Sequence, residues 1–113
     1  PSCDRIISRL QEFLETHYAE QITLYDVAGH LHMNYSYLSA YISQNTGKHF
    51  SEHLNDVRIR HSKTLLAETS YSISYISESI GYSDQSYFGK IFKKLVGVTP
   101  LQYRNQSHRK ELL

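Results

Sequence analysis

Basic side chains near the C-terminus are the groups in this 113-residue chain that could bind a large charged partner. Residues 82–113 hold six Lys/Arg against two Asp/Glu, a net charge of +4, whereas residues 1–81 hold six against nine, a net charge of −3. Such an asymmetry can mark a surface for a polyanion such as nucleic acid, but basic tails also occur in proteins that bind none. Charge alone therefore leaves nucleic-acid binding open. The basic residues are Lys90, Lys93, Lys94, Arg104, Arg109 and Lys110.

Histidines raise a second possibility, a metal site. His49 and His53 are four residues apart on a predicted helix, and His61 lies two turns further along. The pair has no flanking carboxylate pattern and no evident third ligand, whereas a structural zinc needs four ligands and a catalytic one three. We therefore expect no metal and no cofactor, and we place His61 on an apolar face, packed or partly buried.

Enzymatic chemistry has no support in the sequence. There is no nucleophile elbow, no Gly-rich phosphate loop and no paired carboxylates, so we predict a protein that is not an enzyme. The single cysteine, Cys3, sits near the chain end and excludes an internal disulfide, which fits a reducing cytoplasm. No apolar run approaches the roughly 20 residues of a membrane span, so we expect no membrane partner. The abrupt start on Pro1 suggests a piece of a longer protein.

The elements that must position these residues are helices. Periodic apolar residues predict an all-α fold with seven helices and no strand. Expected N-caps are Thr23 (in a capping box with Asp26), Asn34, Ser72, and either Ser83 or Asp84, while Gly47, Gly81 and Gly97 end helices. The predicted helices cover about 4–18, 24–31, 35–45, 50–67, 73–80, 85–96 and, from Pro100, the stretch through Tyr103. Expected core faces include Phe50, Leu54, Val57, His61 and Leu65 on the long helix, and Phe88, Ile91, Phe92 and Leu95 on the sixth.

The two halves of the chain repeat each other. Thr23-Leu24 matches Ser72-Ile73 at an offset of 49 residues, and Ser36-Tyr37-Leu38 matches Ser86-Tyr87-Phe88 at an offset of 50. Each half is predicted to form a short helix, a tight turn and a second helix, with a small residue, Ala28 or Ser77, where the two helices cross. This arrangement is helix-turn-helix geometry. We predict two such subdomains, 1–49 and 68–113, joined by a linker helix over 50–67. At 1.5 Å per residue that linker spans roughly 27 Å, near the 34 Å between successive major-groove segments on one DNA face.

The second repeat carries a specific resemblance. Residues 73–104, ISYISESIGYSDQSYFGKIFKKLVGVTPLQYR, closely resemble the signature of the AraC/XylS family of bacterial transcription regulators. The first half is similar to that family's other unit through Val27-Ala28, Ser36-Tyr37-Leu38, Thr46-Gly47, Phe50 and Arg58. The resemblance covers about residues 5–106. It implies a cytoplasmic regulator that reads two adjacent major grooves of double-stranded DNA, with RNA polymerase as a further partner. It also implies a missing regulatory domain through which the full-length protein could dimerise, whereas the isolated domain should be monomeric.

The resemblance also implies which residues face DNA. Recognition helices at about 35–45 and 85–95 would present base-reading positions Tyr35, Ser36, Ser39 and Ala40 in the first unit and Gln85, Ser86, Gly89 and Lys90 in the second. Phosphate contacts would come from Tyr37, Tyr87, Lys93 and Lys94. Gln suits an adenine edge, Lys a guanine edge, and Ser is a short, permissive partner. N–H groups at the starts of the short helices, at Leu24 and Ile73, could also meet phosphate.

The first unit departs from the family pattern. Ala40 and Ser43 stand where many members carry basic residues, and no Lys or Arg lies between Asn34 and Thr46. We therefore expect the second unit to anchor the DNA and the first to add selectivity, with Ala40 able to meet a thymine methyl.

Each assignment has an alternative that needs no DNA. Ser36 and Ser86 could make only local helix bonds, and Lys93 and Lys94 could form a solvated face. Tyr37 and Tyr87 are expected to be half-buried, with only their hydroxyls near phosphate. For Arg58 an ion pair that holds the units together is favoured over a phosphate contact. A helical protein-interaction module also stays open because the chain has ten tyrosines, although Tyr18, Tyr25, Tyr41 and Tyr75 are expected to pack at the core boundary.

Overall fold

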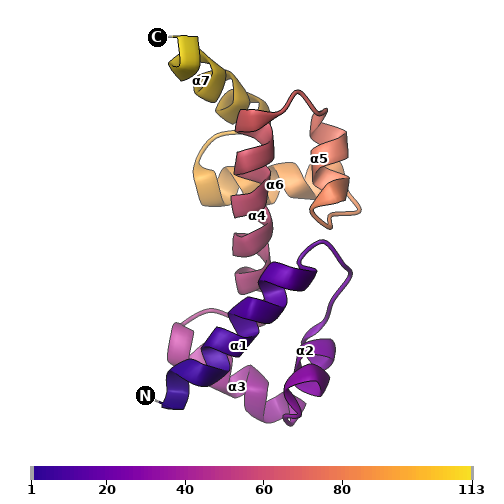
Figure 1. The fold of residues 1–113 in the computed structure, drawn as a ribbon, viewed down its shortest axis with the longest axis vertical. Coiled ribbons are helices and arrows are strands. Elements are labelled where there is room, and N and C mark those ends of the chain that lie inside the picture. Colours follow the sequence, from indigo (N-terminus) through magenta and orange to yellow (C-terminus); the bar gives the residue numbers. More distant parts are fainter. Residues whose placement is uncertain (1, 113) are drawn as a thin grey trace. The chain divides into compact units, whose positions relative to one another are not determined.

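Seven α-helices and no strand make up the part of the chain that the structure describes, which confirms the all-α prediction (Figure 1). The computed structural model describes residues 2–112, with side chains for residues 5–109. The side chains of Cys3 and Lys110 therefore lie outside the described residues. The helices are α1 (Ser2–His17), α2 (Leu24–Leu31), α3 (Tyr35–Thr46), α4 (Phe50–Glu68), α5 (Ile73–Ser79), α6 (Gln85–Val96) and α7 (Pro100–Leu112). None of the described helices is both long and apolar enough to cross a membrane.

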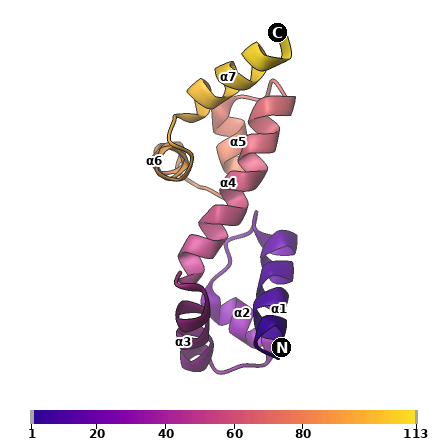
Figure 2. The same cartoon turned by 90° about the vertical axis from the view of Figure 1, so that its left-hand side faces the viewer.

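The chain forms two compact units, which we call unit 1 (Pro1–Val57) and unit 2 (Arg58–Leu113). The division falls within α4, so each unit contains three whole helices and part of α4. In unit 1, α2 contacts both α1 and α3, and in unit 2, α6 contacts both α5 and α7 (Figure 2).

The first two caps of unit 1 form as their sequences predict. Thr23 and Asp26 make the reciprocal capping box of α2: the Asp26 amide donates to Thr23 Oγ1 (3.3 Å) and the Thr23 amide donates to Asp26 Oδ2 (2.7 Å). Asn34 Oδ1 accepts from the Tyr37 amide at 3.0 Å and starts α3. Gly47 ends α3 at φ 74°, a left-handed conformation that glycine adopts without steric cost.

Unit 2 repeats this pattern with different residues. Ser72 Oγ accepts from the Tyr75 amide (3.0 Å), and Asp84, rather than Ser83, caps α6 by accepting from the Ser86 amide (2.9 Å). Gly97 ends α6 at φ 97°. α5 stops at Ser79, with Gly81 at φ 106° two residues later.

The last helix is longer than its sequence indicates. We expected it to run through Tyr103, but α7 continues to Leu112. Thr99 and Gln102 form a capping box at its start, with bonds of 2.9 and 3.1 Å. Arg104 then donates from Nε to the Leu66 carbonyl (3.1 Å) and from Nη2 to the Thr69 carbonyl (3.3 Å). One residue of the basic C-terminal stretch therefore satisfies carbonyls at the end of α4.

Each unit has its own core. Unit 1 buries an apolar cluster, and unit 2 buries a smaller set that includes two phenylalanines. The unit 1 cluster is Leu10, Leu14, Leu24, Val27, Ala28, Leu31, Leu38, Ile42, Leu54 and Val57. The buried apolar residues of unit 2 are Ile59, Leu66, Ile76, Ile80, Tyr82, Phe88 and Phe92.

Two core predictions were wrong. The single stripe expected along α4 holds for Leu54 and Val57, and His61 is partly buried as expected. Leu65, however, is only partly buried, and Ile59, Ser62 and Leu66 are buried outside the expected stripe. The stripe fails because the two ends of α4 pack into different cores, each of which selects its own positions. Ser62 is accommodated because its hydroxyl donates to the Ile59 carbonyl at 2.7 Å. Leu95, expected in the core, is 45% exposed.

Candidate nucleic-acid interface

Each unit contains a helix-turn-helix, made of α2 and α3 in unit 1 and of α5 and α6 in unit 2. Within each pair the helices are in contact. Ala28 and Ser77, the small residues predicted where the helices cross, are buried at 4% and 2% exposure. Side chains this small let two helix axes approach closely, so the repeat in the sequence produces the same local geometry twice.

In unit 1, the predicted base-reading residues lie together on one side of α3. Tyr35, Ser36 and Ala40 are exposed and Ser39 is partly buried, while Leu38 and Ile42 anchor the opposite side in the core. Together with three further residues they line a shallow hollow of about 460 Å³, which we call the α3 hollow. Its lining is Tyr35, Ser36, Ser39, Ala40, Ser43, Gln44 and His49.

Two aromatic residues near the α3 hollow were not identified from the sequence. His49 was treated as a helix-cap residue, and its amide does donate to Glu52 Oε1 (3.4 Å), but its side chain also lines the hollow. Tyr25 was expected to pack at the core boundary; it is instead 69% exposed and stacks on Tyr35, with ring centroids 4.0 Å apart and ring planes 14° apart. The repeat could not indicate either role, because their counterparts Thr99 and Ser74 are not aromatic.

In unit 2, α6 presents a face of different chemistry. Gln85, Ser86 and Lys90 are exposed, Gly89 is partly buried, and Phe88 and Phe92 are fully buried behind them. Lys93 and Lys94 are exposed in the last turn. This face combines an amide, a hydroxyl and ammonium groups, which are the donors and acceptors that meet base edges and phosphates.

The two tyrosines predicted to contact phosphate are both partly accessible. Tyr37 is 58% exposed, and Tyr87, at 48% exposed, is close to the half-burial that was expected of both. The Tyr87 ring contacts Tyr82 edge-on at 5.8 Å. Of the four boundary tyrosines, Tyr18 and Tyr41 are partly buried as predicted, but Tyr25 and Tyr75 are exposed.

Arg58 is an internal residue of unit 2. It is 7% exposed, and its guanidinium carbon lies 5.1 Å from the centroid of the Tyr82 ring. Burial lowers the pKa of Arg58 from its usual value, while Tyr82 and Tyr87 act in the opposite direction. A guanidinium held over an aromatic ring inside the protein stabilises packing, which argues against a role for Arg58 as a phosphate contact.

Behind the C-terminal end of α3, a buried histidine joins three helices of unit 1. His53 Nε2 lies 2.8 Å from Thr46 Oγ1 on α3, and its Nδ1 lies 3.5 Å from the amide nitrogen of Gln11 on α1. Because the Gln11 amide nitrogen can only donate, His53 Nδ1 must accept and Nε2 must carry the proton. Burial lowers the pKa of His53 below its ordinary value, partly offset by Asp56. Burial of the ring therefore favours the neutral imidazole.

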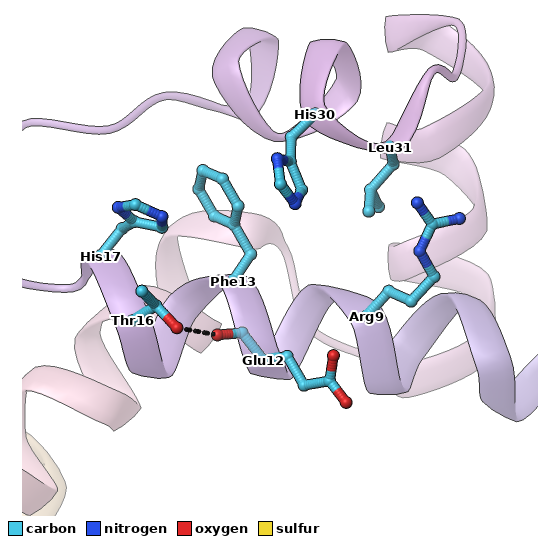
Figure 3. A pocket seen from close by; sticks show the side chains of 7 residues that line it. All are labelled: Arg9, Glu12, Phe13, Thr16, His17, His30 and Leu31. Atoms are coloured by element: carbon cyan, nitrogen blue, oxygen red, sulfur yellow. Dashed lines mark hydrogen bonds between the residues drawn. The ribbon is translucent and has the colours of Figure 1, made fainter.

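A separate hollow of about 240 Å³ lies between α1 and α2 (Figure 3). The Phe13 ring stands between two histidines there, with centroids 4.5 Å from His17 and 4.9 Å from His30. The rim hydroxyl of Thr16 is already used, since it donates to the Glu12 carbonyl at 2.9 Å. Among the described side chains, no group of three His, Cys, Asp or Glu residues could hold a metal ion.

The two helix-turn-helix units with exposed recognition faces define a class, that of tandem helix-turn-helix domains. Residues 27–106 match a family of helix-turn-helix domains, the AraC type. The chain belongs to this family and is a DNA-binding domain of the AraC type.

Curated relatives agree with this assignment. The HTH-type transcriptional regulator YisR of Bacillus subtilis is 33% identical over 107 residues, which cover 95% of this chain and 37% of the relative. The melibiose operon regulatory protein of Escherichia coli K12 is 30% identical over 104 residues, which cover 92% of this chain and 34% of the relative. The chain therefore spans about a third of the length of these relatives.

Solved structures have the same fold. The C-terminal domain of AraT, a response regulator from Geobacillus stearothermophilus, is 36% identical with a TM-score of 0.83, and the match covers 89% of this chain and 84% of that one. The DNA-binding domain of AdpA, solved in complex with a target DNA, has a TM-score of 0.79 over 96% of this chain and 94% of its own. At 18% identity, that likeness shows the fold alone.

Proposed function

We propose that this chain binds double-stranded DNA sequence-specifically, with α3 and α6 as recognition helices in adjacent major-groove segments, and so regulates transcription in a bacterium. The observation that carries the proposal is the α6 face, where Gln85, Ser86 and Lys90 are exposed over a core of Phe88 and Phe92. A Gln amide can bond an adenine edge with two hydrogen bonds, and Lys can reach guanine O6 and N7.

The two units contribute unequally in this proposal. Unit 2 anchors the duplex, because α6 carries Lys90, Lys93 and Lys94 on exposed positions. Unit 1 adds selectivity, because α3 carries no charged residue. Tyr37 and Tyr87, both exposed, would add phosphate contacts through their hydroxyls.

Several finer features belong to the same proposal. Family resemblance supports contact with RNA polymerase, a cytoplasmic location and a function without catalysis. It also supports a monomeric isolated domain and dimerisation of the full-length protein through another domain. Gel filtration with light scattering of the 113-residue chain tests the monomer, and a mass near twice 13.2 kDa would contradict it.

Salt dependence tests DNA binding itself. Each phosphate neutralised by a Lys or Arg releases counterions, so a binder with several phosphate contacts loses affinity steeply between low and physiological salt. We expect fluorescence anisotropy with a labelled random duplex to show binding at low salt that weakens with log salt at a slope of several units. Absence of binding to any duplex, random or selected, at low salt would overturn the proposal.

A further inference from the structure

The reading face of unit 1 differs from that of unit 2 in the kind of group it offers. At matched positions, Tyr35 and Ala40 of α3 stand where α6 has Gln85 and Lys90. The first pair offers ring and methyl surface, and the second offers an amide and an ammonium. A reading face without charge and with apolar groups must find an apolar feature on the base edges if it is to discriminate between sequences.

Only one such feature exists in the major groove. The four bases present hydrogen-bond donors and acceptors there, and thymine alone adds a methyl group, on C5. Side chains that contact this methyl are small or aromatic apolar groups, such as the methyl of Ala or an aromatic ring. Ala40 and Tyr35 are groups of this kind, and both line the α3 hollow.

The shape of the α3 hollow allows a base edge to approach closely. Ser36, Ser39 and Ser43 line it with side chains of only two heavy atoms each, so little separates the helix backbone from the groove. Their hydroxyls can donate to thymine O4 or adenine N7 and accept from adenine N6. Methyl contact and hydroxyl pairing therefore favour the same base pair.

Tyr25 fixes the aromatic wall of the hollow. Its ring stacks on Tyr35 at 4.0 Å with nearly parallel planes, and such stacking restricts the orientation of Tyr35. Tyr25 remains 69% exposed and Tyr35 37% exposed, so this pair keeps apolar ring surface in water beside the recognition helix. Desolvation of that surface by a thymine methyl is favourable.

We propose that unit 1 reads thymine by its C5-methyl group, with Tyr35 and Ala40 as the contacting residues and Tyr25 as the positioning residue. The inference rests on the proposed function, since it names the base that α3 selects.

The test removes the methyl from DNA and leaves base pairing intact. A duplex selected by the 113-residue chain from a random pool is remade with deoxyuridine in place of thymine, one half of the site at a time. We expect the substitution to weaken binding in one half by about fourfold per contacted methyl, the transfer free energy of one such group.

Protein variants assign that loss to unit 1. Tyr35→Ala combined with Ala40→Gly should abolish the difference between thymine and deoxyuridine in that half, and Tyr35→Ala or Tyr25→Ala alone should reduce it. Tyr71→Ala is the matched control, because Tyr71 is a 48% exposed tyrosine of unit 2 with a ring partner of its own, Tyr75 at 4.9 Å. It should leave the difference unchanged. Thermal unfolding of each variant confirms that unit 1 stays folded.

The outcomes separate this inference from the proposed function. If the chain binds the selected duplex but deoxyuridine changes affinity less than twofold in either half, thymine reading is wrong while DNA binding stands. If the loss occurs but persists undiminished in the variant that combines Tyr35→Ala with Ala40→Gly, the assignment to α3 is wrong. If no duplex binds at low salt, both proposals fall.

Discussion

Unit 1 and unit 2 share a fold and differ in the groups that they expose. Both place a recognition helix over buried apolar residues, with Leu38 and Ile42 in unit 1 and Phe88 and Phe92 in unit 2. On the exposed side, α3 carries no charge, whereas α6 carries three lysines. The two units therefore keep apolar residues at equivalent packing positions and carry different groups at equivalent surface positions.

The largest expected difference between the units is in DNA affinity. Lys90→Ala with Lys93→Ala should lower affinity at least tenfold and reduce the salt slope by roughly two, because two cations leave the interface. Ser36→Ala with Ser39→Ala, an uncharged pair of predicted base-reading residues in unit 1, should cost only a few-fold and leave the slope unchanged. Anisotropy titrations at several salt concentrations measure both. Equal or reversed losses would contradict the division into anchor and selector.

A second difference is in pH dependence, because His53 of unit 1 has Tyr103 at its matched position in unit 2. The folded state holds the pKa of His53 below its ordinary value of 6.5 through burial, with Lys48 also lowering it and Asp56 and Glu52 opposing. The unfolded chain therefore takes up this proton first as pH falls. The stability that neutral His53 contributes is complete above about pH 6.5 and is lost below it.

We expect acidification from pH 7.5 to pH 5 to lower the melting temperature of unit 1. NMR signals of the core methyl groups of unit 1 monitor this unfolding. His53→Gln should flatten this dependence, although it also removes the bond to Thr46 and so lowers stability at pH 7.5 by about 1–3 kcal/mol. An unchanged pH profile in His53→Gln would show that another group is responsible.

The residue where the two helices cross should also distinguish the units. Ser77 is 2% exposed, and its hydroxyl has no hydrogen-bond partner within the described part of the chain. Ser77→Ala, which installs the residue found at the matched position 28, should stabilise unit 2 by about 1 kcal/mol. The reverse change, Ala28→Ser, should destabilise unit 1 by a similar amount. Urea unfolding monitors both, and a stability loss in Ser77→Ala would reveal a bonded hydroxyl.

The smallest effect concerns two helical glycines. A Cβ added at Gly29 or Gly89 would meet nothing within 4 Å, so the protein itself does not require glycine at either position. Alanine at each should therefore stabilise its helix by up to about 1 kcal/mol. Only Gly89→Ala should also weaken DNA binding, because Gly89 lies on the reading face of α6. If both variants bind DNA with wild-type affinity, DNA does not approach the α6 backbone closely at Gly89.

Local signals explain what the sequence could predict. Thr23 with Asp26, Asn34, Gly47 and Gly97 act through hydrogen bonds and backbone angles within a few residues, and each forms as expected. The repeat then located both recognition helices. These features depend on near neighbours along the chain, which a sequence displays directly.

Features that depend on distant packing could not be predicted. Periodicity along α4 assumes one core, but Ile59 and Leu66 pack in unit 2 while Leu54 and Val57 pack in unit 1. Arg104 was counted with the basic tail, although it donates to carbonyls 38 and 35 residues earlier. The exposure of Tyr25, and its stack on Tyr35, likewise depends on how the turn between α2 and α3 brings the two helices together.

Selection of binding sites from a random duplex pool tests the central claim, that both units read DNA and unit 2 holds it. We predict recovered sites with two preferred patches about ten base pairs apart, matching one turn of the double helix. Ser36→Ala with Ser39→Ala should relax one patch and leave the other intact. A single patch in the wild-type selection would contradict the account, because it would leave unit 1 with the fold of a DNA reader but without the function.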